Sequence, residues 1–162
     1  MASTARPGLP GPGPVTITRA SGADAQRLTR LCRASGGYRG LYAEAIAAVE
    51  VTPAHIAEHL VFLAADQDAG LLGFYALIRD PPELDMLFVA DRAQGRGVGR
   101  LLVAHMIERA RQCGLAGVRV VSHPPAEAFY RRAGARRTGT VPARPPLTTW
   151  ERPELWFTVP VP

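Results

Sequence analysis

A glycine-rich segment, QGRGVGR at residues 94–100, follows an apolar stretch that is typical of a strand. The helical spacing of apolar residues from Val98 to Met106, with Gly114 as a stop signal, predicts a helix that begins within the glycines. The first turn of a helix has unpaired N–H groups and a positive dipole end, so it can bind phosphate when nothing blocks the approach. The segment therefore predicts either a phosphate-binding turn or a tight connection whose glycines only relieve backbone strain.

The spacing of these glycines excludes two familiar phosphate-binding loops. Their order is G-R-G-V-G and not G-x-G-x-x-G, and no Gly-Lys-Ser/Thr follows, as a P-loop requires. The surrounding strands also read as antiparallel, whereas both of those loops belong to parallel sheets. Dinucleotide binding and nucleoside triphosphate binding are therefore disfavoured.

The whole chain reads as one domain preceded by a tail. Its 162 residues suit a single unit from residue 15 to residue 162, and the proline- and glycine-rich residues 1–14 have little to bury, so we expect a flexible tail there. Residue patterns predict strands at 15–18, 60–66, 70–80, 81–90, 117–123, 136–141 and 154–160. They predict helices at 22–35, 97–114 and 124–134, and a helix in two pieces over 43–60 with Thr52 as a cap. This order predicts a mixed α/β domain.

Composition disfavours several classes of protein. No apolar run approaches the roughly 18 residues of a membrane span, and the first residues lack the apolar core of a signal peptide. The formal net charge is +5 and all 19 basic residues are arginines, but these are scattered along the chain and do not form a run. Cys32 and Cys113 are too few for a disulfide framework. We therefore expect a cytoplasmic protein without a membrane or nucleic-acid partner.

Two motifs in the chain resemble those of one superfamily. QGRGVG resembles the Q/R-x-x-G-x-G/A signature of the GNAT superfamily, the Gcn5-related N-acetyltransferases, and it lies between the fourth strand and the third helix, as in that family. PPAEAFYRRAGA, further downstream, resembles the family's A-x-x-F-Y-x-x-x-G segment. The resemblance covers most of residues 15–160. It implies a single-domain GNAT fold, with a mixed, mainly antiparallel sheet of six to seven strands flanked by about four helices, and it allows a homodimer.

The resemblance implies that acetyl-CoA is the acyl donor and that no metal is needed. The N–H groups of the glycine-rich turn, which Gln94 begins, then bind the pyrophosphate. The amides of the pantetheine arm pair with the open edge of the fourth strand as an added strand does. The residues implied in cofactor binding are Leu87, Phe88, Val89, Gln94, Gly95, Arg96, Gly97, Val98, Gly99, Arg100, Ala126 and Phe129.

The same resemblance implies a general acid and leaves the general base open. Tyr130 stands where the family often uses a tyrosine to protonate the departing thiolate, a step that a phenol with a pKa of ~10 can perform. The alternative is a tyrosine that only packs against the sheet. Glu83 and Asp85 are two apart on one predicted strand, so we expect both on one face. Either one is a candidate base, and Glu83 matches the glutamate of histone-type members, but both also suit contact with solvent or an ammonium group.

The histidines leave several interpretations open. His123 stands near a position where many members carry asparagine, so His123 or Ser122 could replace it, and a base or a cap before the following proline are further alternatives for His123. His55 and His59 are four apart on one predicted helix face, but no third ligand accompanies them in the sequence. We therefore expect no metal site.

The residues expected to contact the acceptor are aromatic. The family selects its acceptor with the first two helices, the loop between them, and the last loop of the sheet. Tyr38, Tyr42 and Trp150 lie in these segments and are predicted to form an aromatic wall, although simple packing explains each of them as well. We expect an acetyl-CoA-dependent N-acetyltransferase that acts on a primary amine of a small molecule or peptide in a direct ternary complex. The alternative is a non-catalytic acyl-CoA-binding or sensing module.

Overall fold

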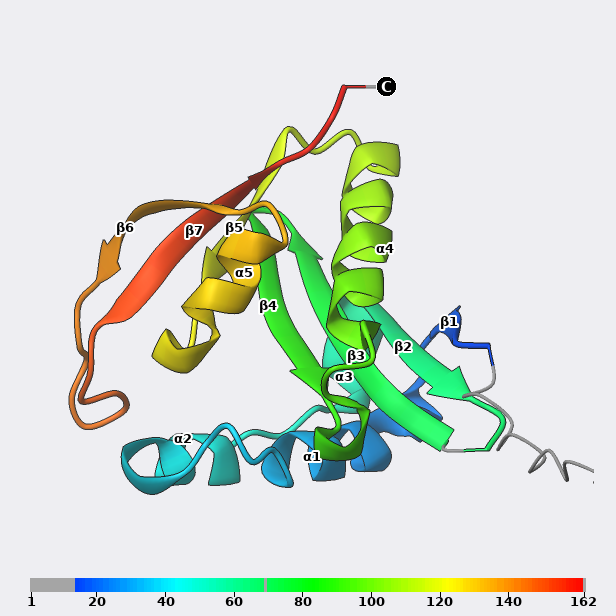
Figure 1. The fold of residues 1–162 in the computed structure, drawn as a ribbon, viewed down its shortest axis with the longest axis horizontal. Coiled ribbons are helices and arrows are strands. Elements are labelled where there is room, and N and C mark those ends of the chain that lie inside the picture. The colour runs from blue at the N-terminus through cyan, green and yellow to red at the C-terminus, as the bar shows by residue number, and fades with distance from the viewer. Residues whose placement is uncertain (1–13, 69, 162) are drawn as a thin grey trace, which may run out of the picture.

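The computed structural model describes residues 14–68 and 70–161, and in these ranges the chain forms one seven-stranded sheet with helices on both faces (Figure 1). The strands are β1 (Thr16–Arg19), β2 (Leu60–Asp66), β3 (Gly70–Arg79), β4 (Pro82–Val89), β5 (Gly117–Val121), β6 (Arg136–Val141) and β7 (Arg152–Thr158). The helices are α1 (Ala25–Arg33), α2 (Ala43–Ala47), α3 (Pro53–Glu58), α4 (Val98–Gln112) and α5 (Glu127–Arg132), with short 3-10 turns η1 (Gly22–Asp24), η2 (Gly40–Tyr42), η3 (Asp91–Ala93) and η4 (Pro124–Ala126). Residues 1–13 of the predicted tail lie outside the described ranges.

The sheet consists of two antiparallel parts that meet at one parallel pair of strands. Its order is β1-β2-β3-β4-β5-β7-β6, and only β4 and β5 run parallel. Within the described residues, these two strands pair at a single position, Glu83 opposite Arg119. Beyond this pair β4 has an edge that β5 does not cover, and this edge forms one wall of the cavity described below.

Two apolar cores lie on opposite faces of the sheet. On one face, Leu102 and Met106 of α4 and Tyr130 of α5 pack with residues of the central strands. On the other face, Leu28 of α1 and Ile56 of α3 pack against β2, β3 and β4. The long helix α4 therefore covers one side of the sheet, and the three short helices α1, α2 and α3 cover the other (Figure 1).

The predicted α/β architecture is confirmed, including its mixed and mainly antiparallel sheet. The helix expected in two pieces over 43–60 is α2 and α3, and the Thr52 hydroxyl caps α3 by accepting a hydrogen bond from the His55 N–H at 3.1 Å. In the part of the chain that the structure describes, no helix is both long and apolar enough to cross a membrane.

Candidate active site

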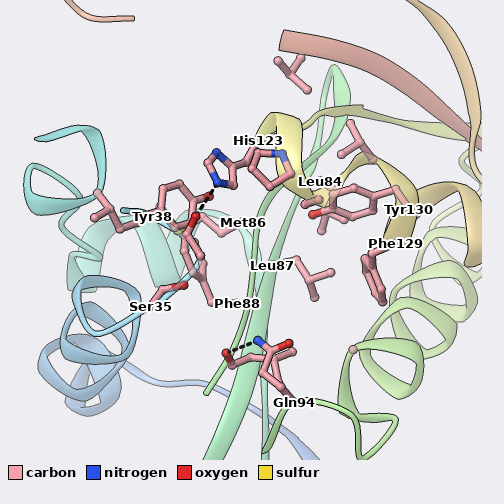
Figure 2. Close-up of a pocket in the computed structure, with 18 of the residues that line it drawn as sticks. Ser35, Tyr38, Leu84, Met86, Leu87, Phe88, Gln94, His123, Phe129 and Tyr130 are labelled. Carbon is pink, nitrogen blue, oxygen red and sulfur yellow. Dashed lines mark hydrogen bonds between the residues drawn. The ribbon is translucent and has the colours of Figure 1, made fainter. Parts of the chain in front are cut away.

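A cavity of about 840 Å³ opens where β4 and β5 diverge. Residues 84–89 of β4 form one wall, and the segments around the glycine-rich turn and the start of α5 form a second. Residues near the ends of α1 and α2, together with the segment that leads into β7, close the opposite end. Figure 2 shows that Tyr38 and His123 lie on one side of β4, and Tyr130 and Phe129 on the other.

Two glycines of the glycine-rich turn adopt the left-handed backbone conformation just before α4. Gly95 and Gly97 have positive φ angles of 77° and 78°, and α4 begins directly afterwards at Val98. A Cβ atom added to either glycine would meet no protein atom within 4 Å, so the space beside them is open. The first N–H groups of α4 have no acceptor within the helix, and none of the described side chains caps this end. These N–H groups are therefore free to bind an anion.

Phe129 explains the third glycine of the turn. A Cβ atom at Gly99 would lie 3.0 Å from Cζ of Phe129, so glycine permits close packing between the start of α4 and α5. The side chains flanking the turn differ in their contacts. The Gln94 amide donates to the Val89 carbonyl at 3.2 Å, whereas Arg96 forms an ion pair of 3.3 Å with Asp66 and does not line the cavity.

A β-bulge shapes the wall that β4 contributes. Met86 pairs with Ala76 and Leu84 pairs with Leu77, so Asp85 has no partner of its own on β3. An extra residue of this kind interrupts the strict alternation of side chains along a strand. Leu87, Phe88 and Val89 line the cavity, as the resemblance implies.

The two candidate bases have different surroundings. The Asp85 carboxylate lines the cavity and accepts a hydrogen bond of 2.9 Å from Nε2 of His55. Glu83 does not line the cavity, and its carboxylate lies 3.5 Å from Arg119, which also binds Glu154 at 2.7 Å. The two carboxylates therefore lie two residues apart on one strand, as the sequence predicts, but only Asp85 lines the cavity.

Tyr130 has the position expected of a proton donor. It projects from α5 toward β4 (Figure 2), lines the cavity, and is only 7% exposed. Burial raises the pKa of its phenol, and the nearby Tyr38 raises it further. The phenol therefore stays protonated at neutral pH. Within the described residues its hydroxyl makes no hydrogen bond, so it is available to a ligand.

Three aromatic rings and His123 pack together at the opposite end of the cavity. His123 stacks on Tyr38 with ring centroids 4.0 Å apart, and Tyr42 meets His123 and Trp150 edge-on at 4.4 and 4.8 Å. Tyr38, His123 and Trp150 line the cavity, whereas Tyr42 does not. The predicted aromatic wall therefore exists as a cluster, with His123 as an additional member.

The contacts of His123 distinguish between the alternatives that the sequence left open for this residue. Its Nε2 donates to the Gly37 carbonyl at 2.9 Å, and burial lowers the pKa of the ring. His123 is the N-cap residue of η4, but its side chain makes no capping hydrogen bond within the described residues, so the alternative of a side-chain cap is not supported. The neutral imidazole instead ties residue 37 to the end of β5.

A second contact links the loop that follows α1, which contains Gly36 and Gly37, to the turn before Gln94. The Gly36 N–H donates to both carboxylate oxygens of Asp91, at 3.1 and 3.0 Å. A Cβ atom at Gly36 would approach this carboxylate to 2.7 Å, so the contact depends on glycine. Asp91 begins η3, the turn that precedes Gln94. Sequence patterns gave no signal of this contact.

His55 and His59 contact each other edge-on, with ring centroids 4.8 Å apart. Nε2 of His55 faces Asp85, as described above, and Nε2 of His59 lies 3.8 Å from Glu58. Across residues 14–68 and 70–161, no group of three or more His, Cys, Asp or Glu side chains is arranged to hold a metal ion.

The comparisons with known proteins agree with this geometry. A family model described as an acetyltransferase (GNAT) domain matches residues 37–144, more than half of the chain. The chain therefore belongs to the GNAT acetyltransferase family. No curated protein sequence matches it.

Solved structures share the fold across nearly the whole chain. A GCN5-related N-acetyltransferase from Rhodopseudomonas palustris is 20% identical, with a TM-score of 0.78 over 93% of this chain and 99% of its own. PaiA N-acetyltransferase from Thermoplasma acidophilum, solved with coenzyme A, is 20% identical, with a TM-score of 0.71 over 90% and 99%. The ribosomal-protein-S18-alanine N-acetyltransferase from Escherichia coli is 16% identical, with a TM-score of 0.68 over 91% and 96%. At these identities the likeness concerns the fold.

Proposed function

We propose that the protein is an acetyl-CoA-dependent N-acetyltransferase that acts on a primary amine in a direct ternary complex. One observation carries the proposal: a single cavity extends from the glycine-rich turn before α4 to the rings of Tyr38, His123 and Trp150, which we call the acceptor end. Tyr130 and Asp85 both line this cavity. A donor and an acceptor held in one cavity can react directly. The exposed Cys113 lies outside the cavity wall, and burial raises the pKa of the Cys32 thiol to about 12, so neither suits a covalent acyl carrier.

The protein groups that would hold the donor fit coenzyme A. The N–H groups of residues 97–100 surround the start of α4, where the helix dipole favours the pyrophosphate, whereas the Arg96 N–H already donates to the Ala93 carbonyl at 3.3 Å. Gly97 leaves the approach open, and Arg100 adds a positive charge to the cavity wall. The uncovered edge of β4 offers backbone partners for the pantetheine amides at Leu87, Phe88 and Val89, and Ala126 and Phe129 line the facing wall.

Two residues would move the protons of the reaction. Asp85 takes a proton from the ammonium form of the acceptor, directly or through water, so that the freed nitrogen lone pair can attack the thioester carbonyl, and the nitrogen releases a second proton to solvent as the amide forms. The new bond is C–N and the bond that breaks is C–S, whose electron pair leaves with sulfur. Tyr130 donates its phenolic proton to this thiolate and afterwards recovers a proton from solvent.

Calorimetry with coenzyme A, followed by a thiol-release assay with acetyl-CoA and a panel of amines, tests the proposal. We expect coenzyme A to bind, and at least one amine to accelerate thiol release above the rate of hydrolysis. Binding without amine-dependent release would favour the acyl-CoA-sensing alternative. A lack of coenzyme A binding would contradict both functions.

Asp85→Asn tests the assignment of the base. Because a positioned base contributes about 10²–10⁴ in rate, we expect this variant to lower kcat about 100-fold. Glu83→Gln is the matched control, since it makes the same change on the same strand outside the cavity wall, and we expect kcat close to that of the unaltered protein. Steady-state thiol release measures both. The opposite ranking would assign the base to Glu83.

A further inference from the structure

Arg152 places a positive charge at the acceptor end of the cavity. It is the first residue of β7 and lines the cavity together with Trp150. The next residue, Pro153, accepts a hydrogen bond of 2.9 Å through its carbonyl from the Ser122 N–H, just beyond the end of β5. Arg152 therefore lies beside the turn that carries His123, at the end of the cavity where the aromatic rings gather.

The described protein supplies no counter-charge for this guanidinium. Arg152 is half-buried, its Nε–H is buried without a hydrogen-bond partner, and no ion pair involves it in residues 14–68 and 70–161. Arg119 and Arg137, which start from neighbouring strands, each bind a glutamate. A partly desolvated arginine without a partner is costly, and a planar guanidinium binds a carboxylate through two parallel hydrogen bonds. The arrangement therefore favours an anionic group on the ligand.

The same cavity also carries a negative charge, the carboxylate of Asp85. Asp85 is the single carboxylate among the described residues of the cavity wall. Its Oδ2 is bound to His55, and Oδ1 has no partner within the described residues, so it can receive an N–H from an ammonium or amine group. Of the arginines on the wall, Arg100 lies in the glycine-rich turn and Arg132 on α5. Arg152, two residues after Trp150, is the one of these three that is nearest in the chain to the aromatic wall.

We infer that the acceptor is an amine that also carries a carboxylate, and that Arg152 binds this carboxylate while Asp85 faces the amine. The inference rests on the proposed N-acetyltransferase function and adds the chemical class of its acceptor. The rings of Tyr38 and Trp150 give the same cavity an apolar surface, which suits the hydrocarbon part of such a molecule.

Matched amines that differ only in the carboxylate test this inference. The pairs are phenylalanine with phenethylamine, leucine with isopentylamine, and glycine with methylamine, each assayed by thiol release. In at least one pair we expect kcat/KM to be about tenfold or more higher for the amino acid, as a charged hydrogen-bonded pair provides. Equal or higher values for the simple amine in every pair would overturn the inference.

Arg152→Gln tests the residue itself, with Arg132→Gln as the control on the same cavity. We expect Arg152→Gln to erase the preference for the carboxylate, and Arg132→Gln to change both members of a pair alike. Equal losses on both members with Arg152→Gln would mean that Arg152 acts on the donor, and would overturn the inference.

Binding separates this inference from the proposed function. Calorimetry on the coenzyme A complex compares phenylalanine with phenylalaninamide. Tighter binding of the carboxylate, lost in Arg152→Gln, supports the inference even when no thiol is released, whereas the proposed function then fails. Equal binding of the two, or no binding at millimolar concentration, overturns the inference whatever the thiol-release assay shows.

Discussion

Replacement of Tyr130 by phenylalanine is expected to lower kcat about 100-fold or more, because a positioned general acid contributes about 10²–10⁴ in rate. The affinity for coenzyme A is expected to stay close to that of the unaltered protein. The phenyl ring keeps the packing of Tyr130 against Phe129 and Phe157, whose ring centroids lie 5.3 and 6.3 Å away. The lost hydroxyl has no hydrogen-bond partner among the described residues, so its removal leaves no protein group unpaired. Steady-state thiol release and calorimetry measure the two effects separately.

Tyr38→Phe is the control for this prediction. Tyr38 lines the same cavity, and burial raises the pKa of its phenol to about 12, but its ring stacks on His123 at the acceptor end. We expect kcat to change little in this variant. Unchanged kcat in Tyr130→Phe as well would assign Tyr130 to packing alone.

The pH dependence gives a second readout for Tyr130. Its pKa is raised, so the phenol, which is the form that donates a proton, stays populated at pH values above the ordinary value of about 10. Any loss of activity between pH 8 and about 10 should therefore persist in Tyr130→Phe. A loss in this range that disappears in the variant would contradict the proposed protonation state.

Those parts of the site that depend on short segments could be predicted from the sequence. The glycine-rich turn and the start of α4 follow from residues 94–114 alone, because spacing of apolar residues and glycines fixes both. The position of Tyr130 on a short helix after β5 follows in the same way from a contiguous motif. The antiparallel run β2-β3-β4 could be predicted too, since each of its pairs joins strands that follow one another in the chain.

The remaining features depend on contacts between distant residues, and sequence patterns do not contain them. The bulge that separates Asp85 from the alternation of β4 is set by its register with β3. His55 reaches Asp85 from a helix thirty residues earlier in the chain, and Arg152 lines the cavity only because β7 pairs with β5. Each of these contacts involves a residue to which we assign a role in the proposed reaction. The fold and the conformation of the glycine-rich turn were therefore predictable, whereas the surroundings of Asp85 and Arg152 required the structure.

Gly97→Val is expected to weaken coenzyme A binding by roughly 10- to 100-fold. A β-branched residue at φ 78° carries strain of about 1–3 kcal/mol, and each 1.4 kcal/mol corresponds to tenfold in affinity. Relief of this strain rotates the neighbouring peptide groups and misdirects the N–H groups that would hold the pyrophosphate. Gly114→Val is the matched control, because Gly114 has a φ of 74° with open space at Cβ and lies at the far end of the same helix. Both variants should lower the melting temperature, but calorimetry should detect weaker coenzyme A binding only in Gly97→Val. Equal affinities in the two variants would mean that the pyrophosphate does not bind at this turn.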